Sequence, residues 1–180
     1  IWNYAYLNKG LSLIYNGKKI QSKKGLFDLL NNNLQENESL YPIIHLSAGS
    51  FEFAFTHSDK VFTEEHYSFV NGQHTTQGGT HQSAFREALV KVLKDFFKKD
   101  YDPSDIRSGL VASISLRINE PVFESQTKTK LGSTNMMPDG SGQAVRTFIL
   151  DAVKSTLDDY LHINSDVAEL LLQKIIRNEK

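Results

Sequence analysis

"HTTQGGTHQSAFREALVKVLKDFFKKD", residues 74–100, contains the clearest structural signal in this chain. Gly78 and Gly79 predict a turn, and Thr80 directly after them is a suitable helix N-cap. The apolar residues that follow recur with a helical period: Phe85, Ala88, Leu89, Val92, Leu93 and Phe96. Lysines near the end of the stretch complement the helix dipole. The stretch therefore predicts a long amphipathic helix that packs one face on a core.

Apolar runs on both sides of this helix predict the strands of a sheet. The run GLVASISLRI, residues 109–118, is almost continuously apolar, which is typical of a central strand. Before the helix, three further strands are predicted within residues 41–49, 50–58 and 64–72. In the second of them Phe51, Phe53 and Phe55 share one face, because side chains alternate along a strand.

A hairpin and further helices complete the predicted order. Residues 11–20 alternate in polarity around Asn16-Gly17, a pair typical of a tight turn. Helices are predicted at residues 25–35 and 144–161. A short helix is predicted after Asp102, which would be its N-cap, with Pro103 at the first helical position. A last helix is predicted to begin after Asn164 or Ser165 as its N-cap and to end at Ile176. Helices and strands in this order predict an α+β fold, with one sheet and helices packed on a face.

The composition restricts the class of protein. The chain has 180 residues, a net charge of −1, 39% hydrophobic and 23% charged residues, which indicates a globular domain. It has no cysteine, so disulfides and thiolate metal sites are excluded. No apolar run reaches the roughly 20 residues that span a bilayer, and no signal peptide is present, so we expect a cytoplasmic protein. Ile1 rather than Met begins the chain, and both ends carry apolar patterns, so we expect a piece of a longer protein.

Two kinds of catalytic centre are poorly supported by the sequence. A zinc site needs about four convergent ligands, and His66, His74 and His81 are scattered outside any HExxH motif. Surface or hydrogen-bonded histidines are the better interpretation. The candidate nucleophiles Ser113, Ser115 and Ser125 lie outside any GxSxG motif, so a hydrolytic triad is not expected.

Lysines could serve solubility or bind phosphate. The clusters at 18–19, 23–24 and 91–99 are interpreted first as a solvated surface. The stretch FESQTKTKLGS, residues 123–133, differs because it places Gln126 and Lys128 two residues apart after a strand, without any glycine-rich phosphate loop nearby. Alternate residues of an extended loop point the same way, and Lys128 can extend a compact cation towards a phosphate.

Three blocks in this order carry a resemblance: GGTHQSAFREAL at 78–89, DIRSGLVASISLRI at 105–118 and EPVFESQTKTKLGS at 120–133. Together they resemble the B-type ATPase subunit of bacterial type IIA DNA topoisomerases, which is found in DNA gyrase and in topoisomerase IV. YLNKGLSLIYNGKK near the start resembles the entry into the same region, so the similarity covers nearly the whole chain. The insert-like stretch DGSGQAVRTFI favours topoisomerase IV over gyrase.

The resemblance implies a transducer domain at residues 1–163, followed by a helix at 164–180 that leads towards an absent cleavage module. It implies a ribosomal-protein-like fold with a left-handed β-α-β crossover, an exception to the usual handedness, and one mainly antiparallel or mixed sheet with helices on one face. It also implies that Gln126 and Lys128 contact the γ-phosphate of ATP held by an absent N-terminal domain. Arg86 is expected to line the cavity through which DNA passes.

The implied activity belongs to the intact protein. ATP and Mg²⁺ would be bound mainly by the absent domain, and ATP binding would close a dimer clamp around double-stranded DNA. The implied partners are DNA, a second copy of the same protein and the DNA-cleaving A-type subunit, with no membrane. The chain by itself is expected to be inactive, to hold no metal and to be monomeric.

Two alternatives stay open at this point. A free-standing ribosomal-protein-like module could bind RNA through its lysines, although the QTK stretch would then have no role. The chain could also be the transducer of a related mismatch-repair or chaperone ATPase clamp, in which GGTH together with EPxFxxQTKTKL is not expected.

Overall fold

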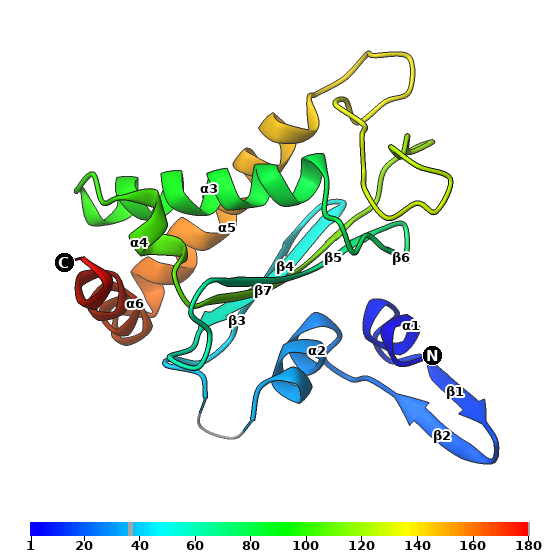
Figure 1. Cartoon of the computed structure of the whole chain (residues 1–180), viewed down its shortest axis with the longest axis horizontal. Helices are drawn as coiled ribbons and strands as arrows, with labels where there is room; N and C mark the ends of the chain where they lie inside the picture. The colour runs from blue at the N-terminus through cyan, green and yellow to red at the C-terminus, as the bar shows by residue number, and fades with distance from the viewer. Residues whose placement is uncertain (36–37, 180) are drawn as a thin grey trace.

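The computed structural model describes residues 1–35 and 38–179 and contains thirteen helices and strands within them (Figure 1). In chain order they are α1 (Trp2–Leu7), β1 (Ser12–Tyr15), β2 (Lys18–Gln21), α2 (Leu26–Asn33), β3 (Ile44–Ala48), β4 (Phe51–His57), β5 (Glu64–Val70), β6 (Gln73–His74), α3 (Thr80–Phe97), α4 (Pro103–Arg107), β7 (Leu110–Leu116), α5 (Val145–Ile163) and α6 (Ser165–Asn178). The predicted α+β class is confirmed.

The main sheet is mixed, with the strand order β3-β4-β7-β5-β6. Neighbouring strands are antiparallel except β5 and β7, which run parallel and are connected through β6, α3 and α4. This is the β-α-β unit that a parallel pair requires. The run at 109–118 forms β7, flanked by strands on both sides, so its prediction as a central strand is confirmed.

The principal core lies between the sheet and the pair α3 and α5, which cover one face (Figure 1). Phe51, Phe53 and Phe55 of β4 all point to this face and surround Phe85 of α3, with ring centroids 5.5 Å apart for Phe53 and Phe85. Burying four aromatic rings together contributes both area and favourable ring contacts to stability.

The opposite face of the sheet is covered as well. Leu26, Leu29 and Leu30 of α2 form a smaller buried cluster with Ala54 and Val111, which alternate with the residues of the main core. The expectation of helices on one face therefore holds for α3 and α5 but is incomplete, because α2 lies on the other face (Figure 1).

The turn and the helix caps predicted from the sequence are confirmed in part. The hairpin turn is confirmed, since Asn16 and Gly17 adopt φ values of 49° and 73° between β1 and β2. Asp102 caps α4 by accepting a hydrogen bond from the Ser104 amide. Thr80 as N-cap is wrong: Gly79 holds that position, and the Thr80 hydroxyl donates to the Ser133 carbonyl instead.

Candidate functional site

Residues 122–132 form a narrow hairpin-like loop after β7. Phe123 and Leu131 pair antiparallel, the Glu124 amide donates to the Lys130 carbonyl at 3.0 Å, and the Gly132 amide donates to the Val122 carbonyl at 2.8 Å. The backbone reverses at the tip, where the Lys128 amide donates to the Ser125 carbonyl at 3.1 Å. We call residues 122–132 the QTK loop.

The QTK loop is anchored to the turn before α3. Leu131 is fully buried and pairs in parallel with Gly79; its amide donates to the Gly78 carbonyl at 3.1 Å, and its carbonyl accepts from the Thr80 amide at 3.0 Å. A Cβ atom at Gly79 would overlap the backbone N and O of Leu131, and φ of Gly79 is +132°. Only glycine therefore permits this contact, which joins two blocks far apart in the sequence.

The tip of the QTK loop is open to solvent. Gln126 and Lys128 are both exposed, and Lys128 adopts a φ of 54°. Within residues 1–35 and 38–179 the Lys128 ammonium forms no ion pair, whereas the neighbouring Lys130 ammonium lies 2.8 Å from the Glu124 carboxylate. Lys130 is therefore paired within the loop, whereas the Lys128 ammonium is exposed to solvent. In Figure 1 the chain between β7 and α5 projects beyond the end of the sheet.

Arg86 lies elsewhere, in a charged cluster between β5 and the middle of α3. Its Nε and Nη2 donate to the two oxygens of Glu64 at 2.9 and 2.7 Å. The same carboxylate lies 3.1 Å from Nε2 of His66 and 3.6 Å from Nε of Arg107. We call these four residues the Glu64 cluster.

The Glu64 cluster keeps a net positive charge. Burial by itself raises the pKa of Glu64, but hydrogen bonds from Arg86 and His66 lower it below its usual value. The hydrogen bond to Glu64 raises the pKa of Arg86. Burial lowers the pKa of His66, so this imidazole is neutral near pH 7. Two guanidinium groups and one carboxylate then leave one positive charge.

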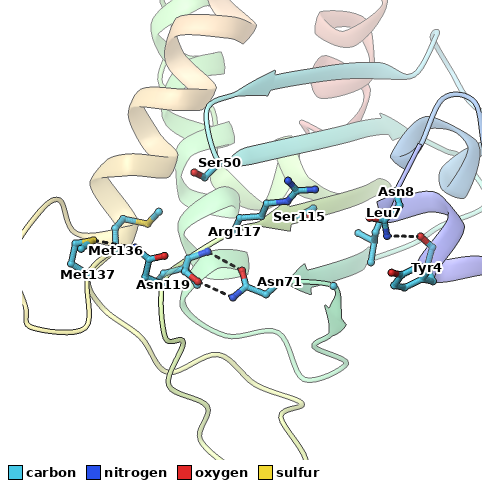
Figure 2. A pocket seen from close by; sticks show the side chains of 12 residues that line it. Tyr4, Leu7, Asn8, Ser50, Asn71, Ser115, Arg117, Asn119, Met136 and Met137 are labelled. Atoms are coloured by element: carbon cyan, nitrogen blue, oxygen red, sulfur yellow. Dashed lines mark hydrogen bonds between the residues drawn. The ribbon is translucent and has the colours of Figure 1, made fainter. Parts of the chain in front are cut away.

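Two hollows in the protein surface are lined in part by the chain between β7 and α5. The first, of about 620 Å³, is bounded on one side by Tyr4 and Leu7 of α1 and by Asn8 directly after it, and on the other side by Met136 and Met137 (Figure 2). The second, of about 610 Å³, lies at the base of the QTK loop between the first turns of α3 and α5. The QTK loop therefore has open space on the side of its anchor.

The histidines contribute structure within the described part of the chain. No three His, Asp or Glu side chains converge there as metal ligands. His81 is fully buried beside the Thr75 hydroxyl, and His74 stacks on Phe69 with centroids 4.8 Å apart. His57, which no sequence motif singled out, is fully buried between the Tyr41 hydroxyl and the Ile106 carbonyl. The alternation in β4 could have indicated its burial.

The fold and the anchored QTK loop together agree with one class of protein. The chain belongs to the DNA gyrase B family of type IIA topoisomerases. The sequence pattern of this family, described as DNA gyrase B, matches residues 15–180. It is 41% identical to the B subunit of DNA topoisomerase 4 from Borreliella burgdorferi over 99% of this chain and 28% of that protein. It is 30% identical to the B subunit of DNA gyrase from Clostridium acetobutylicum over 96% of this chain and 29% of that protein.

Solved structures agree with the fold. The 43K ATPase domain of Thermus thermophilus gyrase B superposes with a TM-score of 0.75 at 24% identity, over 98% of this chain and 50% of that chain. The topoisomerase IV ATP-binding domain of Francisella tularensis gives a TM-score of 0.70 at 24% identity, with the same coverage.

Membership of this family decides between the classes of protein left open by the sequence. A free-standing RNA-binding module and a mismatch-repair or chaperone clamp belong to other families. The chain spans less than a third of the length of the two curated relatives named above. No helix in the described part of the chain has the length and apolar character needed to cross a membrane.

Proposed function

We propose that this chain is the transducer region of the B subunit of a type IIA topoisomerase, coupling ATP binding and hydrolysis to closure of a clamp on DNA. Residues 1–163 would form the transducer, and residues 164–180 would lead towards a cleavage module. In the intact protein an upstream domain would bind ATP and Mg²⁺. Double-stranded DNA, a second copy of the same protein and the A-type subunit would be its partners in the bacterial cytoplasm.

The observation that carries the proposal is the exposed Lys128 ammonium on a loop whose base is fixed. The bridge between Leu131 and Gly79 ties the loop to α3, while the tip extends beyond the core. A cation presented in this way can reach a phosphate bound by a neighbouring domain, and Gln126 can add an amide donor.

A phosphate contact of this kind can act as a switch. Lys128 and Gln126 would bind the terminal phosphate of ATP and would lose that contact after hydrolysis. A ligand shifts a conformational equilibrium by its difference in affinity for the two states, so ATP would favour the closed arrangement of the two domains. The bridge at Gly79 would transmit the position of the loop to α3.

Arg86 provides the link to DNA. It lies on α3, the helix that anchors the loop, and only two of its five N–H donors bind Glu64. The remaining donors suit a phosphate of the DNA backbone. We propose that Arg86 lines the cavity through which the duplex passes.

The test is Lys128→Ala in the intact B subunit. We expect ATP turnover to fall about 100-fold, the size of effect seen when one preorganised donor to a developing negative charge is removed. Lys130→Ala is the matched control, because Lys130 is two residues away but pairs with Glu124, and we expect turnover within about twofold of wild type, since an exposed pair contributes little.

Equal loss of turnover in both variants would show that the loop's total charge matters rather than the position of Lys128, and would overturn the proposal. The chain of residues 1–180 by itself should hydrolyse no ATP and cleave no DNA. Turnover by this purified chain that disappears on Lys128→Ala would contradict the assignment of the ATP site to another domain.

A further inference from the structure

The Glu64 cluster brings together two arginines from different helices. Glu64 is the first residue of β5, Arg86 lies in the middle of α3, and Arg107 is the last residue of α4. Both guanidinium groups face the same oxygen, Oε2, at 2.7 Å from Arg86 and 3.6 Å from Arg107. Two positive charges that lie beside the same carboxylate would repel each other without that anion between them.

We infer that Glu64 is a positioning residue that holds Arg86 and Arg107 as a pair, so that their outer N–H groups bind one phosphate of duplex DNA. The inference rests on the proposed function, because it adds Arg107 and Glu64 to the DNA contact proposed for Arg86.

The unused donors support this arrangement. Arg86 donates hydrogen bonds to Glu64 from Nε and from Nη2, so its Nη1 hydrogens can bind another acceptor. The Arg86 side chain is 35% exposed. Arg107 is 24% exposed, and its buried Nε has no hydrogen-bond partner in the part of the chain that the structure describes. The two side chains thus have more donors than their shared carboxylate can satisfy.

The surroundings keep the pair in place. The Gly109 amide donates to the Thr63 carbonyl at 2.7 Å, and the Ser108 hydroxyl donates to the Phe62 carbonyl at 3.4 Å. These bonds connect the residues before Glu64 with those after Arg107. Bonds between the segments that flank Glu64 and Arg107 help to hold the two charged groups at a fixed separation.

The phosphate chemistry follows from geometry and charge. Guanidinium groups bind phosphate through paired N–H donors, and the cluster retains one positive charge because His66 is neutral near pH 7. Phosphate recognition of this kind is independent of base sequence.

A simple counterion would behave differently from a positioning residue. If Glu64 only neutralised Arg86, removing its charge would strengthen the attraction to DNA. If Glu64 orients the pair, removing its charge lets the guanidinium groups separate, and the contact with phosphate weakens despite the added positive charge. The direction of the change therefore decides between the two roles.

The experiment uses the intact B subunit with its A-type partner and linear duplex DNA of random sequence. Glu64→Gln should raise the DNA concentration for half-maximal stimulation of ATP turnover about tenfold, the equivalent of one charge-assisted contact. Arg107→Gln should do the same and should lower the slope of log affinity against log salt by about 0.9. Arg107→Lys should recover only part of the loss, because lysine lacks the planar pair of donors.

The matched control is Glu65→Gln. Glu65 is exposed and, as the next residue along β5, faces the opposite side of the strand. The substitution changes the net charge by the same amount, and we expect half-maximal stimulation at the same or a slightly lower DNA concentration. Tighter DNA binding by both Glu64→Gln and Glu65→Gln would overturn the inference, as would an unchanged salt slope in Arg107→Gln.

Loss of the fold and failure of the proposed function can be distinguished from failure of the inference. The Glu65→Gln control should retain the basal ATP turnover measured without DNA, and urea denaturation of each variant checks that its fold is kept. If Arg86→Glu removes DNA stimulation while Glu64→Gln strengthens it, only the positioning role fails. If Arg86→Glu leaves stimulation intact, the proposed DNA contact fails as well.

Discussion

The QTK loop and α6 lie at opposite ends of the molecule, and each carries a lysine in a contrasting environment (Figure 1). Lys128 is exposed at the loop tip. Lys174 of α6 is 7% exposed and lies 3.0 Å from Asp59, under the backbone of Gly109. The Asn178 amide extends this contact by donating to the Asp105 carbonyl at 2.8 Å.

The difference separates two uses of positive charge. A lysine with an internal partner stabilises the packing of a helix on the core, and its charge is satisfied. A lysine held outwards contributes little to stability and is available to a ligand. Arg86 is intermediate, because Glu64 takes only part of its donor capacity.

The largest expected effect is on the anchor of the QTK loop. Gly79→Ala should lower the free energy of unfolding by about 4 kcal/mol, because the new methyl group overlaps Leu131 and the φ of +132° is strained for alanine. Urea denaturation of the chain measures the change.

The control for this variant is Gly140→Ala, where φ is +79° but no atom lies within 4 Å of the new methyl group. It should cost about 1 kcal/mol from backbone strain alone. Equal costs at the two positions would mean that the contact with Leu131 is unimportant.

The second prediction concerns pH and the end of the molecule near α6. Burial, with a contribution from Lys174, lowers the pKa of His57 to about 4, whereas the unfolded chain has a value of about 6.5. Above pH 6.5 His57 is neutral in both the folded and the unfolded chain, so its titration does not reduce the free energy of unfolding. As the pH falls from 6.5 to 4 the unfolded state binds the proton first, so stability falls by up to about 3 kcal/mol.

His57→Gln should flatten this dependence, since glutamine can still donate to the Ile106 carbonyl but does not titrate. His81, whose pKa burial also lowers to about 4, adds a loss in the same pH range that this variant retains. Urea denaturation at pH 7 and pH 4.5 provides the comparison, and an unchanged slope in His57→Gln would exclude a contribution of His57.

The third prediction compares the two lysines directly. Lys174→Ala should lower the free energy of unfolding by about 2 kcal/mol, because it removes a buried stem and the partner of Asp59. Lys128→Ala should change it by less than about 0.5 kcal/mol. A similar loss of stability in both variants, measured by urea denaturation of the chain, would remove the distinction between the two ends.

The smallest effect on stability is expected from the ion pair inside the QTK loop. Lys130 and Glu124 pair at 2.8 Å, but their side chains are 42% and 52% exposed. Glu124→Gln should therefore change the free energy of unfolding by less than about 0.5 kcal/mol and less still in high salt. A larger change would indicate that this pair, rather than Leu131, supports the loop.

Local patterns along the chain were enough to predict the long helices, the central strand, the hairpin and the family resemblance. Phe85, Leu89 and Leu93 recur at a helical spacing that local geometry makes visible, and Asn16-Gly17 marks a turn by conformational preference alone. These patterns did not reveal α1 or β6, because six and two residues are too few for a period to be recognised.

Only the tertiary structure shows which distant residues contact one another. The contact of Leu131 with Gly79, the burial of His57, the pairing of Arg86 with Glu64 and Arg107, and the position of α2 all join segments distant in sequence. Periodicity reports which side of an element is buried, but it carries no information about the partner on the other side. That partner depends on how all the elements pack together, which is why the anchored loop and the Glu64 cluster became visible only in the fold.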